Sequence, residues 1–240
     1  RIFVASCCGK IRKDNKGENL INICLLVCGR FNFTKQTVHS FITLNSEIKD
    51  YSWLVFDNLP EEKSNREYIE SLNLSNLTYL SSNKNIGIAR ATSVLMELAQ
   101  IDQDKYPYTI YLQNDWECIK EGFIEPTLTF LQNYSDIAFV KLTTKGYHNP
   151  NAINSYQQKP VFLAEIKNWP FYLIENGHFT FNVHIIRTSL LKNLYPITCE
   201  KDIQQKFHDL NYLRADINLG HAPFVHIGNT EKCRTSNWIR

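Results

Sequence analysis

The sequence lacks several features that would assign it at once to a large class of proteins. Its apolar runs, such as Ile23–Val27, are far shorter than the ~20 residues of a membrane-spanning helix, so we expect no membrane segment. Charge of one sign is also missing, because 26 Lys and Arg stand against 24 Asp and Glu. No run of about five or more like charges occurs, and the composition therefore gives no indication of nucleic-acid binding.

Paired cysteine patterns are missing as well. The seven cysteines form no C-x-x-C pair and no Cys/His spacing of a zinc site. Cys24 and Cys28 lie in an apolar run and are expected to be small, buried core residues. This favours a reducing compartment, and we expect a cytoplasmic protein. Residue 1 is Arg and the only methionine is Met96, which leaves room for a missing leader or flanking domain. The Asn-, Ile- and Lys-rich composition is typical of an AT-rich genome, viral genomes among them.

Two glycine-rich phosphate-binding motifs are absent. The sequence contains no G-x-x-x-x-G-K-[ST] P-loop and no G-x-G-x-x-G dinucleotide fingerprint, which argues against a dehydrogenase. Glycine occurs instead in Asn85–Arg90, a predicted transition from loop to helix. There Gly87 permits close approach of the backbone to a ligand, and Arg90 projects from the first helical turn.

What the sequence does contain, from Ile21 onward, is a regular alternation of strands and helices. Runs that are apolar throughout alternate with segments whose apolar residues recur at helical spacing. This pattern predicts an α/β fold with a mostly parallel sheet covered by helices on both faces. No linker or repeat interrupts it, so we expect a single domain over residues 1–240. The predicted strands of this half are Ile21–Val27, Tyr51–Phe56, Leu77–Leu80 and Thr109–Leu112, and the predicted helices are Thr34–Leu44, Glu61–Leu72 and Ile88–Gln100.

The second half is less regular. Residues 1–19 are expected to form an irregular lead-in or an edge strand, and Thr143–Glu165 a long loop. The predicted strands here are Ile137–Leu142, Phe179–Asn182, Tyr212–Ile217 and Ala222–Ile227, and the predicted helix is Asp202–Leu210.

Polar clusters follow four successive predicted strands. They contain Arg30, Asp57, Asn83–Gly87 and Gln113–Glu117. In an open parallel sheet the ligand site lies beyond the carboxyl ends of the strands. We therefore expect these clusters to form one site at one edge of the sheet.

Carboxylates in two of these clusters are candidate ligands. If the chain stays extended, Asp115 and Glu117 lie on one face, about 7 Å apart at the backbone. Hard divalent cations take such carboxylates together with substrate phosphates, and the alternative is a charged turn after the strand. Asp57 could accept hydrogen bonds from a ribose or a base, or it could form an Asx turn with Asn58 and Pro60.

The order of the motifs resembles that of a known enzyme family. An apolar strand before C-G-R is followed by L-V-F-D-N, N-K-N-I-G-I-A-R-A, Y-L-Q-N-D-W-E, C-E-K-D-I and F-V-H-I-G, between Ile21 and Gly228. This succession is similar to that of nucleotide-sugar-dependent glycosyltransferases with the Rossmann-like GT-A fold, most closely family 2. The resemblance implies an inverting transferase with a donor half over about residues 20–117 and an acceptor half over about residues 118–240.

The resemblance implies roles for the residues expected to bind the donor. Asp57 corresponds to the acid that reads the nucleoside. Asn85, Gly87 and Arg90 lie in the loop that closes over the nucleotide, and Arg30 is expected to join them.

The resemblance also implies a metal site. Gln113-Asn114-Asp115 falls on the family's Asp-x-Asp motif, which carries the metal and the diphosphate, with Gln113 in place of the first acid. Asp115 is then the principal ligand of Mn²⁺ or Mg²⁺, with help from Glu117 and His226, and Asn114 lies against the donor. For His226 the alternative is an ordinary structural histidine.

A catalytic base is implied further along the chain. The segment C-E-K-D-I resembles the family's E-D-x-D-L segment, and aligning Ile203 puts Glu200 on the base and Asp202 on the second acid. A slip of one position exchanges them, and ordinary helix N-capping is the alternative. The aromatic- and amide-rich residues 147–172 lie where the family receives its acceptor, unless the aromatics are core residues.

The predicted function is metal-dependent transfer of a sugar from a nucleoside-diphosphate sugar, with UDP favoured, to a hydroxyl of a carbohydrate or glycosylated acceptor. Two alternatives stay open. A sugar nucleotidyltransferase would need a richer basic loop than C-G-R-F-N. A non-catalytic carbohydrate-binding protein could keep the same fold, and Gln113 in place of an acid would suit it.

Overall fold

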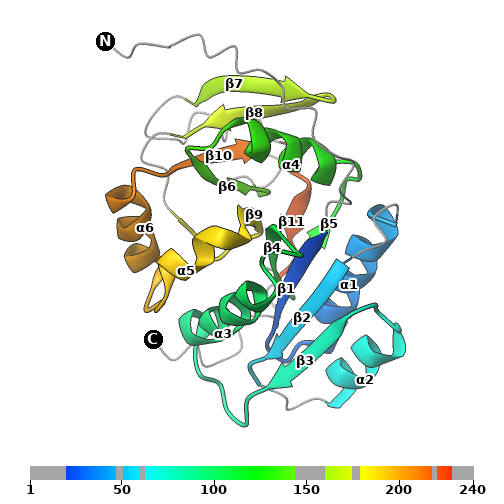
Figure 1. The fold of residues 1–240 in the computed structure, drawn as a ribbon. Helices are drawn as coiled ribbons and strands as arrows, with labels where there is room; N and C mark the ends of the chain where they lie inside the picture. Colours follow the sequence, from blue (N-terminus) through cyan, green and yellow to red (C-terminus); the bar gives the residue numbers. More distant parts are fainter. Residues whose placement is uncertain are drawn as a thin grey trace.

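The computed structural model describes residues 20–46, 51–59, 63–143, 160–174, 179–217 and 221–228. Within them, helices lie on both sides of a nine-stranded sheet (Figure 1). The strands of this sheet are β1 (Ile21–Val27), β2 (Tyr51–Asp57), β3 (Leu77–Ser81), β4 (Tyr108–Gln113), β6 (Ile137–Lys141), β7 (Val161–Ile166), β8 (Trp169–Leu173), β9 (His184–Arg187) and β10 (Leu213–Ile217).

The sheet is mostly parallel. Its order is β3-β2-β1-β4-β9-β6-β10-β8-β7, and all of these strands except β8 and β9 run in the same direction. The four strands predicted in the first half are confirmed, and the α/β fold class with them. Because β1 to β4 are parallel, their carboxyl ends meet at one edge.

Helices and a small second sheet complete the described part. Helices α1 (Phe31–Leu44), α2 (Lys63–Ser71) and α4 (Ile124–Asn133) contribute to the core on one face of the large sheet. Helices α3 (Ile88–Ile101), α5 (Leu191–Leu194), which follows the 3-10 turn η2 (Thr188–Leu190), and α6 (Glu200–Asp209) contribute to the core on the other face. The second sheet pairs β5 (Trp116–Cys118) antiparallel with β11 (Phe224–His226).

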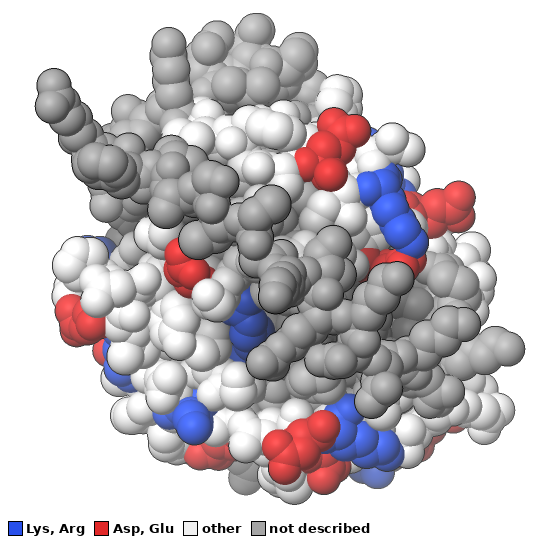
Figure 2. Space-filling view, turned by 45° about the horizontal axis from the view of Figure 1, so that its top comes forward, with Lys and Arg blue, Asp and Glu red and all other residues white. Residues whose placement is uncertain are grey.

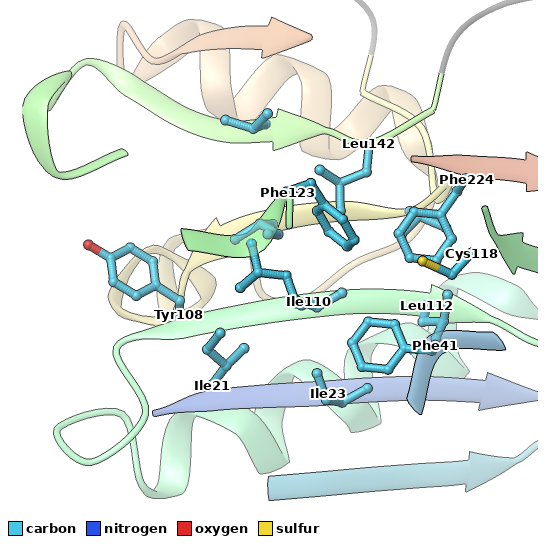
Figure 3. Close-up of a cluster of buried hydrophobic side chains, with 14 of the residues drawn as sticks. Ile21, Ile23, Phe41, Tyr108, Ile110, Leu112, Cys118, Phe123, Leu142 and Phe224 are labelled. Carbon is cyan, nitrogen blue, oxygen red and sulfur yellow. The ribbon is translucent and has the colours of Figure 1, made fainter. Parts of the chain in front are cut away.

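Strand β1 shows why the sheet is buried on both faces. Ile21 and Ile23 belong to the cluster that contains Phe41 of α1 (Figure 3), whereas Cys24 belongs to the cluster with Leu95 of α3. All five side chains are fully buried. Because side chains alternate between the faces of a strand, a strand that is apolar throughout needs cover on both sides. Burying one such large side chain contributes about 1.5–3 kcal/mol.

The strand expected at Phe179–Asn182 is not formed, and β9 follows it instead. Phe179 and Phe181 are buried, as a strand pattern requires. Their backbone N–H groups, however, donate to Gln204 and Glu200 of α6. Side-chain acceptors thus replace the neighbouring strand as hydrogen-bond partners of this segment.

A hairpin of β7 and β8 begins within the region expected to be a long loop, Thr143–Glu165, because β7 starts at Val161. Lys167 and Asn168 join the two strands with positive φ angles of 50° and 66°, as a type I′ turn requires. Lysine is not typical of that turn, and Phe162 on the edge strand β7 is 56% exposed. Neither the residues of the turn nor the apolar pattern of β7 therefore predicted the hairpin from the sequence. Residues 144–159, and with them much of the expected acceptor region, lie outside the described part.

The expectations drawn from composition concern the cysteines, membrane-spanning helices and surface charge. Cys24 is buried as expected, but Cys28 follows β1 at the polar edge and is half-exposed, and the described cysteines are free. None of the described helices is long and apolar enough to cross a membrane. On the face shown in Figure 2, acidic and basic side chains are interspersed among uncharged ones. The expected lead-in over residues 1–19 lies outside the described residues.

Candidate active site

Polar segments follow β1, β2, β3 and β4 at the carboxyl edge of the sheet (Figure 1). The register shows that the ends are level, because Val27 pairs with Asp57 and Asp57 with Ser81. On the other side of β1, Leu26 pairs with Gln113. The predicted clusters therefore do share one edge.

The turn after β4 consists of Asn114 and Asp115. The backbone N–H of Asn114 donates to the carbonyl of Leu26 at 3.0 Å. Its buried side-chain amide donates to the carbonyl of Gly29 and to Oγ1 of Thr34, both at 3.0 Å. The amide that was expected to lie against a donor is thus engaged within the protein, where it ties this turn to the start of α1.

Arg30 reaches the same turn because the backbone after β1 bends sharply. Gly29 and Arg30 both have positive φ, 56° and 54°, a conformation that costs glycine least. Arg30 is the N-cap of α1, and its carbonyl accepts from the N–H groups of Phe33 and Thr34 at 3.0 and 3.1 Å. Its guanidinium Nη1 donates to Oδ2 of Asp115 at 3.1 Å.

Strand β11 brings His226 to the same carboxylate. His226 stands opposite Trp116 of β5, and the centroids of the two rings are 4.9 Å apart. The N–H of Ile227 donates to the carbonyl of Asp115 at 2.8 Å, and His226 Nε2 lies 3.2 Å from Asp115 Oδ2. Side chains from three segments far apart in the sequence therefore meet at one oxygen of Asp115.

Glu117 lies apart from this group. The chain turns at Asn114 and Asp115 before β5 begins, so the extended chain on which the pairing of Asp115 with Glu117 depended is not present at these two residues. Residues alternate between the faces of β5, and Trp116 contacts the ring of His226, so Glu117 points to the opposite face. Among the residues that the structure describes, no three His, Cys, Asp or Glu side chains are grouped so that they could hold a metal ion.

Asp115 and His226 nevertheless fit part of a coordination shell. Asp115 Oδ1 is buried and has no hydrogen-bond partner among the described residues. A Cβ on Gly228 would lie 2.9 Å from Asp115 Oδ2 and 3.1 Å from His226 Nε2, so glycine keeps the space beside both atoms open. One carboxylate and one imidazole suit a divalent ion that takes its other ligands from substrate phosphates and water.

Asp57 ends β2 and is almost fully buried. Its Oδ1 accepts from the N–H of Leu59 at 3.2 Å, which is the Asx turn considered as the alternative for this residue. Its Oδ2 accepts from the hydroxyl of Tyr79 at 2.9 Å. Burial and the negative charge of Asp57 raise the pKa of the Tyr79 hydroxyl, which therefore stays protonated and keeps donating. The sequence did not indicate Tyr79, because it stands at an ordinary aromatic position of a strand.

Asn58 holds the loop after β3. Its Nδ2 donates to Asn85 Oδ1, and its Oδ1 accepts from the N–H of Ile86, both at 3.0 Å. Asn85 Oδ1 also accepts from the N–H of Gly87 at 2.8 Å. Gly87 has a φ of 84°, which favours glycine, and α3 begins directly after it. Asn58, for which the sequence indicated only a turn, is therefore a positioning residue for this loop.

The start of α3 lies beside the segment that leads into α6. Arg90 is exposed in the first turn of α3. Ser93, further along the helix, donates its hydroxyl to the carbonyl of Ala89 at 3.0 Å and lies 3.4 Å from the carbonyl of Ile197. Helix α3, which follows the loop expected to cover a nucleotide, therefore contacts the segment that leads into the helix expected to carry the base.

Helix α6 begins with two acidic residues in its first turn. Glu200 is exposed, and its Oε1 accepts from the N–H of Phe181 at 2.6 Å. Asp202 Oδ2 accepts from the N–H of Thr198 at 3.3 Å and from Lys206 Nζ at 3.2 Å. Partial burial raises the pKa of Asp202, but these hydrogen bonds and the charge of Lys206 lower it overall. Asp202 thus binds the backbone just before the N-cap, Cys199, and the side chain of Lys206, contacts that suit the structural alternative for this pair.

Aromatic contacts connect Glu200 to the end of β4. Phe181, which donates to Glu200, packs against Tyr111 of β4 with the ring centroids 6.5 Å apart. The Tyr111 hydroxyl lies 3.5 Å from Nε2 of Gln113, directly before the turn that carries Asp115. The candidate base and the candidate metal ligands therefore belong to one connected region.

The chain is similar to known proteins in fold. No protein-family model matches the chain, and no curated protein sequence does. Among solved structures, the chain is similar to residues 1–349 of TarS from S. aureus, with 13% identity, a TM-score of 0.59, and coverage of 85% of this chain and 59% of that one. It is similar to the mannosyltransferase PcManGT from Pyrobaculum calidifontis in complex with GDP-Man and Mn²⁺, with 11% identity, a TM-score of 0.59, and coverage of 81% of this chain and 53% of that one. It is also similar to GalNAc-T7 with UDP, GalNAc and Mn²⁺, with 13% identity, a TM-score of 0.62, and coverage of 91% of this chain and 45% of that one.

These similarities confirm the GT-A fold that the motifs implied. The chain spans between 45% and 59% of the length of the three structures. At such low identity the likeness extends to the fold, and the chemistry has to be argued from the residues of this chain.

Proposed function

We propose that the chain is a metal-assisted, inverting glycosyltransferase that moves a sugar from a nucleoside-diphosphate sugar to an acceptor hydroxyl. The observation that carries the proposal is the meeting of Arg30, Asp115 and His226 at the carboxyl end of β4. A guanidinium, a carboxylate and an imidazole at that edge suit a diphosphate with a divalent cation.

The donor would lie across the carboxyl edge of the sheet. Asp57, held by its bonds to Leu59 and Tyr79, would contact the nucleoside. The loop of Asn85 and Gly87 would cover it, with Arg90 exposed at the start of α3. GalNAc-T7, solved with UDP and GalNAc, favours a UDP-sugar, although PcManGT is in complex with GDP-Man.

Asp115 and His226 would hold a divalent cation, Mn²⁺ or Mg²⁺. When bound, such a cation neutralises the charge that develops on the leaving nucleoside diphosphate. Asn114 contributes by fixing the turn from which Asp115 projects. Glu117, on the opposite face of β5, takes no part in this arrangement.

Glu200 would be the general base. An inverting displacement needs a base within about 3 Å of the acceptor hydroxyl, on the face of the sugar opposite the leaving group. Glu200 is exposed and accepts one hydrogen bond from the backbone of Phe181, whereas Asp202 is engaged by Thr198 and Lys206. The hydroxyl proton passes to Glu200 while the bond from the sugar to the diphosphate breaks and the bond to the acceptor oxygen forms.

The test is a panel of UDP- and GDP-sugars incubated with the protein and Mn²⁺, with released nucleoside diphosphate as the measured product. A parallel thermal-shift series measures binding of UDP and GDP with and without Mn²⁺. We expect one diphosphate to stabilise the protein in a Mn²⁺-dependent way, and its sugar donor to be turned over.

Three results would overturn the proposal. Absence of any stabilisation by nucleoside diphosphates would remove the donor site. Binding of a donor without turnover, across a panel of carbohydrate acceptors, would favour a non-catalytic carbohydrate-binding protein. Release of pyrophosphate from a sugar 1-phosphate and a nucleoside triphosphate would identify a nucleotidyltransferase instead.

A further inference from the structure

One oxygen of Asp115 has two side-chain neighbours. Arg30 Nη1 lies 3.1 Å and His226 Nε2 3.2 Å from Oδ2. The side chains are 28% exposed for Arg30, 13% for Asp115 and 19% for His226, so the pair is only partly screened by water. The space that Gly228 leaves open adjoins Asp115 Oδ2 and His226 Nε2, so Oδ2 is the oxygen that a cation entering there would meet, and Arg30 already contacts it.

We propose that Arg30 is an internal cation that competes with a divalent ion for Asp115 and moves to the donor diphosphate when the ion binds. This inference rests on the proposed function. A divalent ion bound to Oδ2 would stand within a few ångströms of a guanidinium that contacts the same oxygen, and like charges at that distance repel strongly. Arg30 therefore has to leave before the ion is bound stably.

The local backbone allows this movement without a change of fold. Gly29 and the first turn of α1 fix the main chain of Arg30, because the carbonyl of Arg30 accepts from Phe33 and Thr34. The long side chain can therefore change partner while its backbone stays in place. A planar guanidinium binds phosphate oxygens in a fork geometry as well as it binds carboxylates, so a diphosphate at this edge is a suitable second partner.

The exchange makes the binding of ion and diphosphate cooperative. Without the diphosphate, the ion must displace the Arg30 guanidinium from Asp115, and the guanidinium then loses its contact with that carboxylate. With the diphosphate, the displaced guanidinium gains a new anion. Each ligand therefore raises the affinity for the other by the same factor.

The experiment measures Mn²⁺ binding by electron paramagnetic resonance in the absence of any nucleotide, for the wild-type chain, Arg30→Gln and Lys35→Gln. Gln at position 30 removes the competing charge but keeps a polar side chain. Lys35 is exposed in the same helix α1, so Lys35→Gln is a control for the loss of one positive charge. We expect Arg30→Gln to bind Mn²⁺ about tenfold more tightly than wild type, which corresponds to about 1.4 kcal/mol, and Lys35→Gln to bind it within about twofold of wild type.

Equal, weaker or undetectable Mn²⁺ binding by a folded Arg30→Gln variant overturns the inference. Because no nucleotide is present, this result is independent of whether the chain uses a nucleotide sugar. If Arg30→Gln does not fold, as judged by circular dichroism, a measurement on the wild-type chain tests the inference instead. The Nε–H resonance of Arg30 in a ¹⁵N spectrum must then shift as Mg²⁺ is added, and an unchanged resonance at saturating Mg²⁺ overturns the proposal.

Discussion

Asp115 is the residue at which the ionisable side chains of the site meet. Its Oδ2 is shared by Arg30 and His226, its carbonyl accepts from Ile227, and Gly228 leaves space beside it. A residue with so many neighbours from distant segments acts as the junction of the site, and its substitution separates the role of charge from the role of shape.

Asp115→Asn keeps the shape of the side chain and removes its charge. We expect it to abolish the Mn²⁺-dependent part of nucleoside-diphosphate affinity, because a neutral amide is a poor ligand for the ion. The free energy of unfolding should fall by only about 1 kcal/mol or less, since the ion pair with Arg30 is partly exposed. Titrations with UDP in the presence and absence of Mn²⁺ measure the effect, and an unchanged difference between them would contradict it.

Asp57 offers a test of nucleoside recognition. We expect Asp57→Asn to weaken binding of a nucleoside and of its diphosphate by similar factors, about tenfold if one charged hydrogen bond is lost. Tyr79→Phe is the matched control, because it removes the partner at 2.9 Å but leaves the carboxylate. Calorimetric titrations of both ligands measure the factors. A loss confined to the diphosphate would place Asp57 with the phosphates instead.

At the scale of single residues, the sequence indicated which side chains carry the chemistry better than it indicated their hydrogen-bond partners. Asp115 and His226 were expected to share a ligand, and the structure brings them together. Tyr79 and Asn58 were missed, because a tyrosine within a strand and an asparagine in a turn have common structural uses and nothing in their spacing distinguishes them. Glu117 was expected beside Asp115 on the condition of an extended chain, but a turn lies at Asn114 and Asp115, and no third His, Cys, Asp or Glu joins Asp115 and His226 among the described residues.

At the scale of elements, the start of α6 determines which acid acts as base. Glu200→Gln keeps the acceptor for the Phe181 N–H but cannot take a proton, so donor affinity should survive while the transfer rate falls by about 10²–10⁴-fold. Asp202→Asn should reduce transfer less and lower the free energy of unfolding by about 1 kcal/mol, because it weakens the bonds to Thr198 and Lys206. Single-turnover transfer and urea unfolding separate the two effects. The opposite pattern would make Asp202 the base.

Elements formed by local pattern were predictable, and elements formed by distant pairing were not. Strands β1, β2 and β4 are mostly apolar and were found from the sequence. The short ribbon of β5 and β11 pairs residues more than a hundred positions apart, and only that pairing carries His226 to Asp115. The segment with Phe179 looked like a strand because its aromatic residues alternate, but α6 supplies its hydrogen-bond acceptors.

At the scale of the whole molecule, the mostly parallel sheet explains why one edge carries the site. Two core clusters, one on each face, hold the sheet between the helices (Figure 3 shows part of one). The antiparallel strand β9 joins β4 to β6 and so connects the two halves of the sheet. Its first residue, His184, is therefore a probe of how the halves are held together.

The surroundings of His184 predict how stability depends on pH. Its ring stacks on Tyr111 with the centroids 5.5 Å apart and contacts Phe139 at 5.6 Å. Burial lowers the pKa of His184 to about 4, the hydrogen bond to the carbonyl of Asn182 opposes this shift, and the charge of Lys141 adds to it. In the unfolded chain an imidazole titrates near 6.5. As the pH falls from about 6.5 to about 4, the unfolded chain gains a proton that the folded chain does not bind, so the free energy of unfolding decreases by about 3 kcal/mol.

His184→Phe isolates this contribution, because phenylalanine keeps an aromatic ring between Tyr111 and Phe139 but does not titrate. Urea unfolding at pH 7 and pH 4.5 should show that wild type loses about 2–3 kcal/mol more than His184→Phe over this interval. Carboxylates also titrate there, but they are common to both proteins and cancel in the comparison. His208→Gln, which removes an exposed imidazole instead, is the control for the loss of a histidine that is not buried. An equal loss in His184→Phe and wild type would mean that the imidazole is protonated while buried, and that the junction of the two halves of the sheet tolerates a charge.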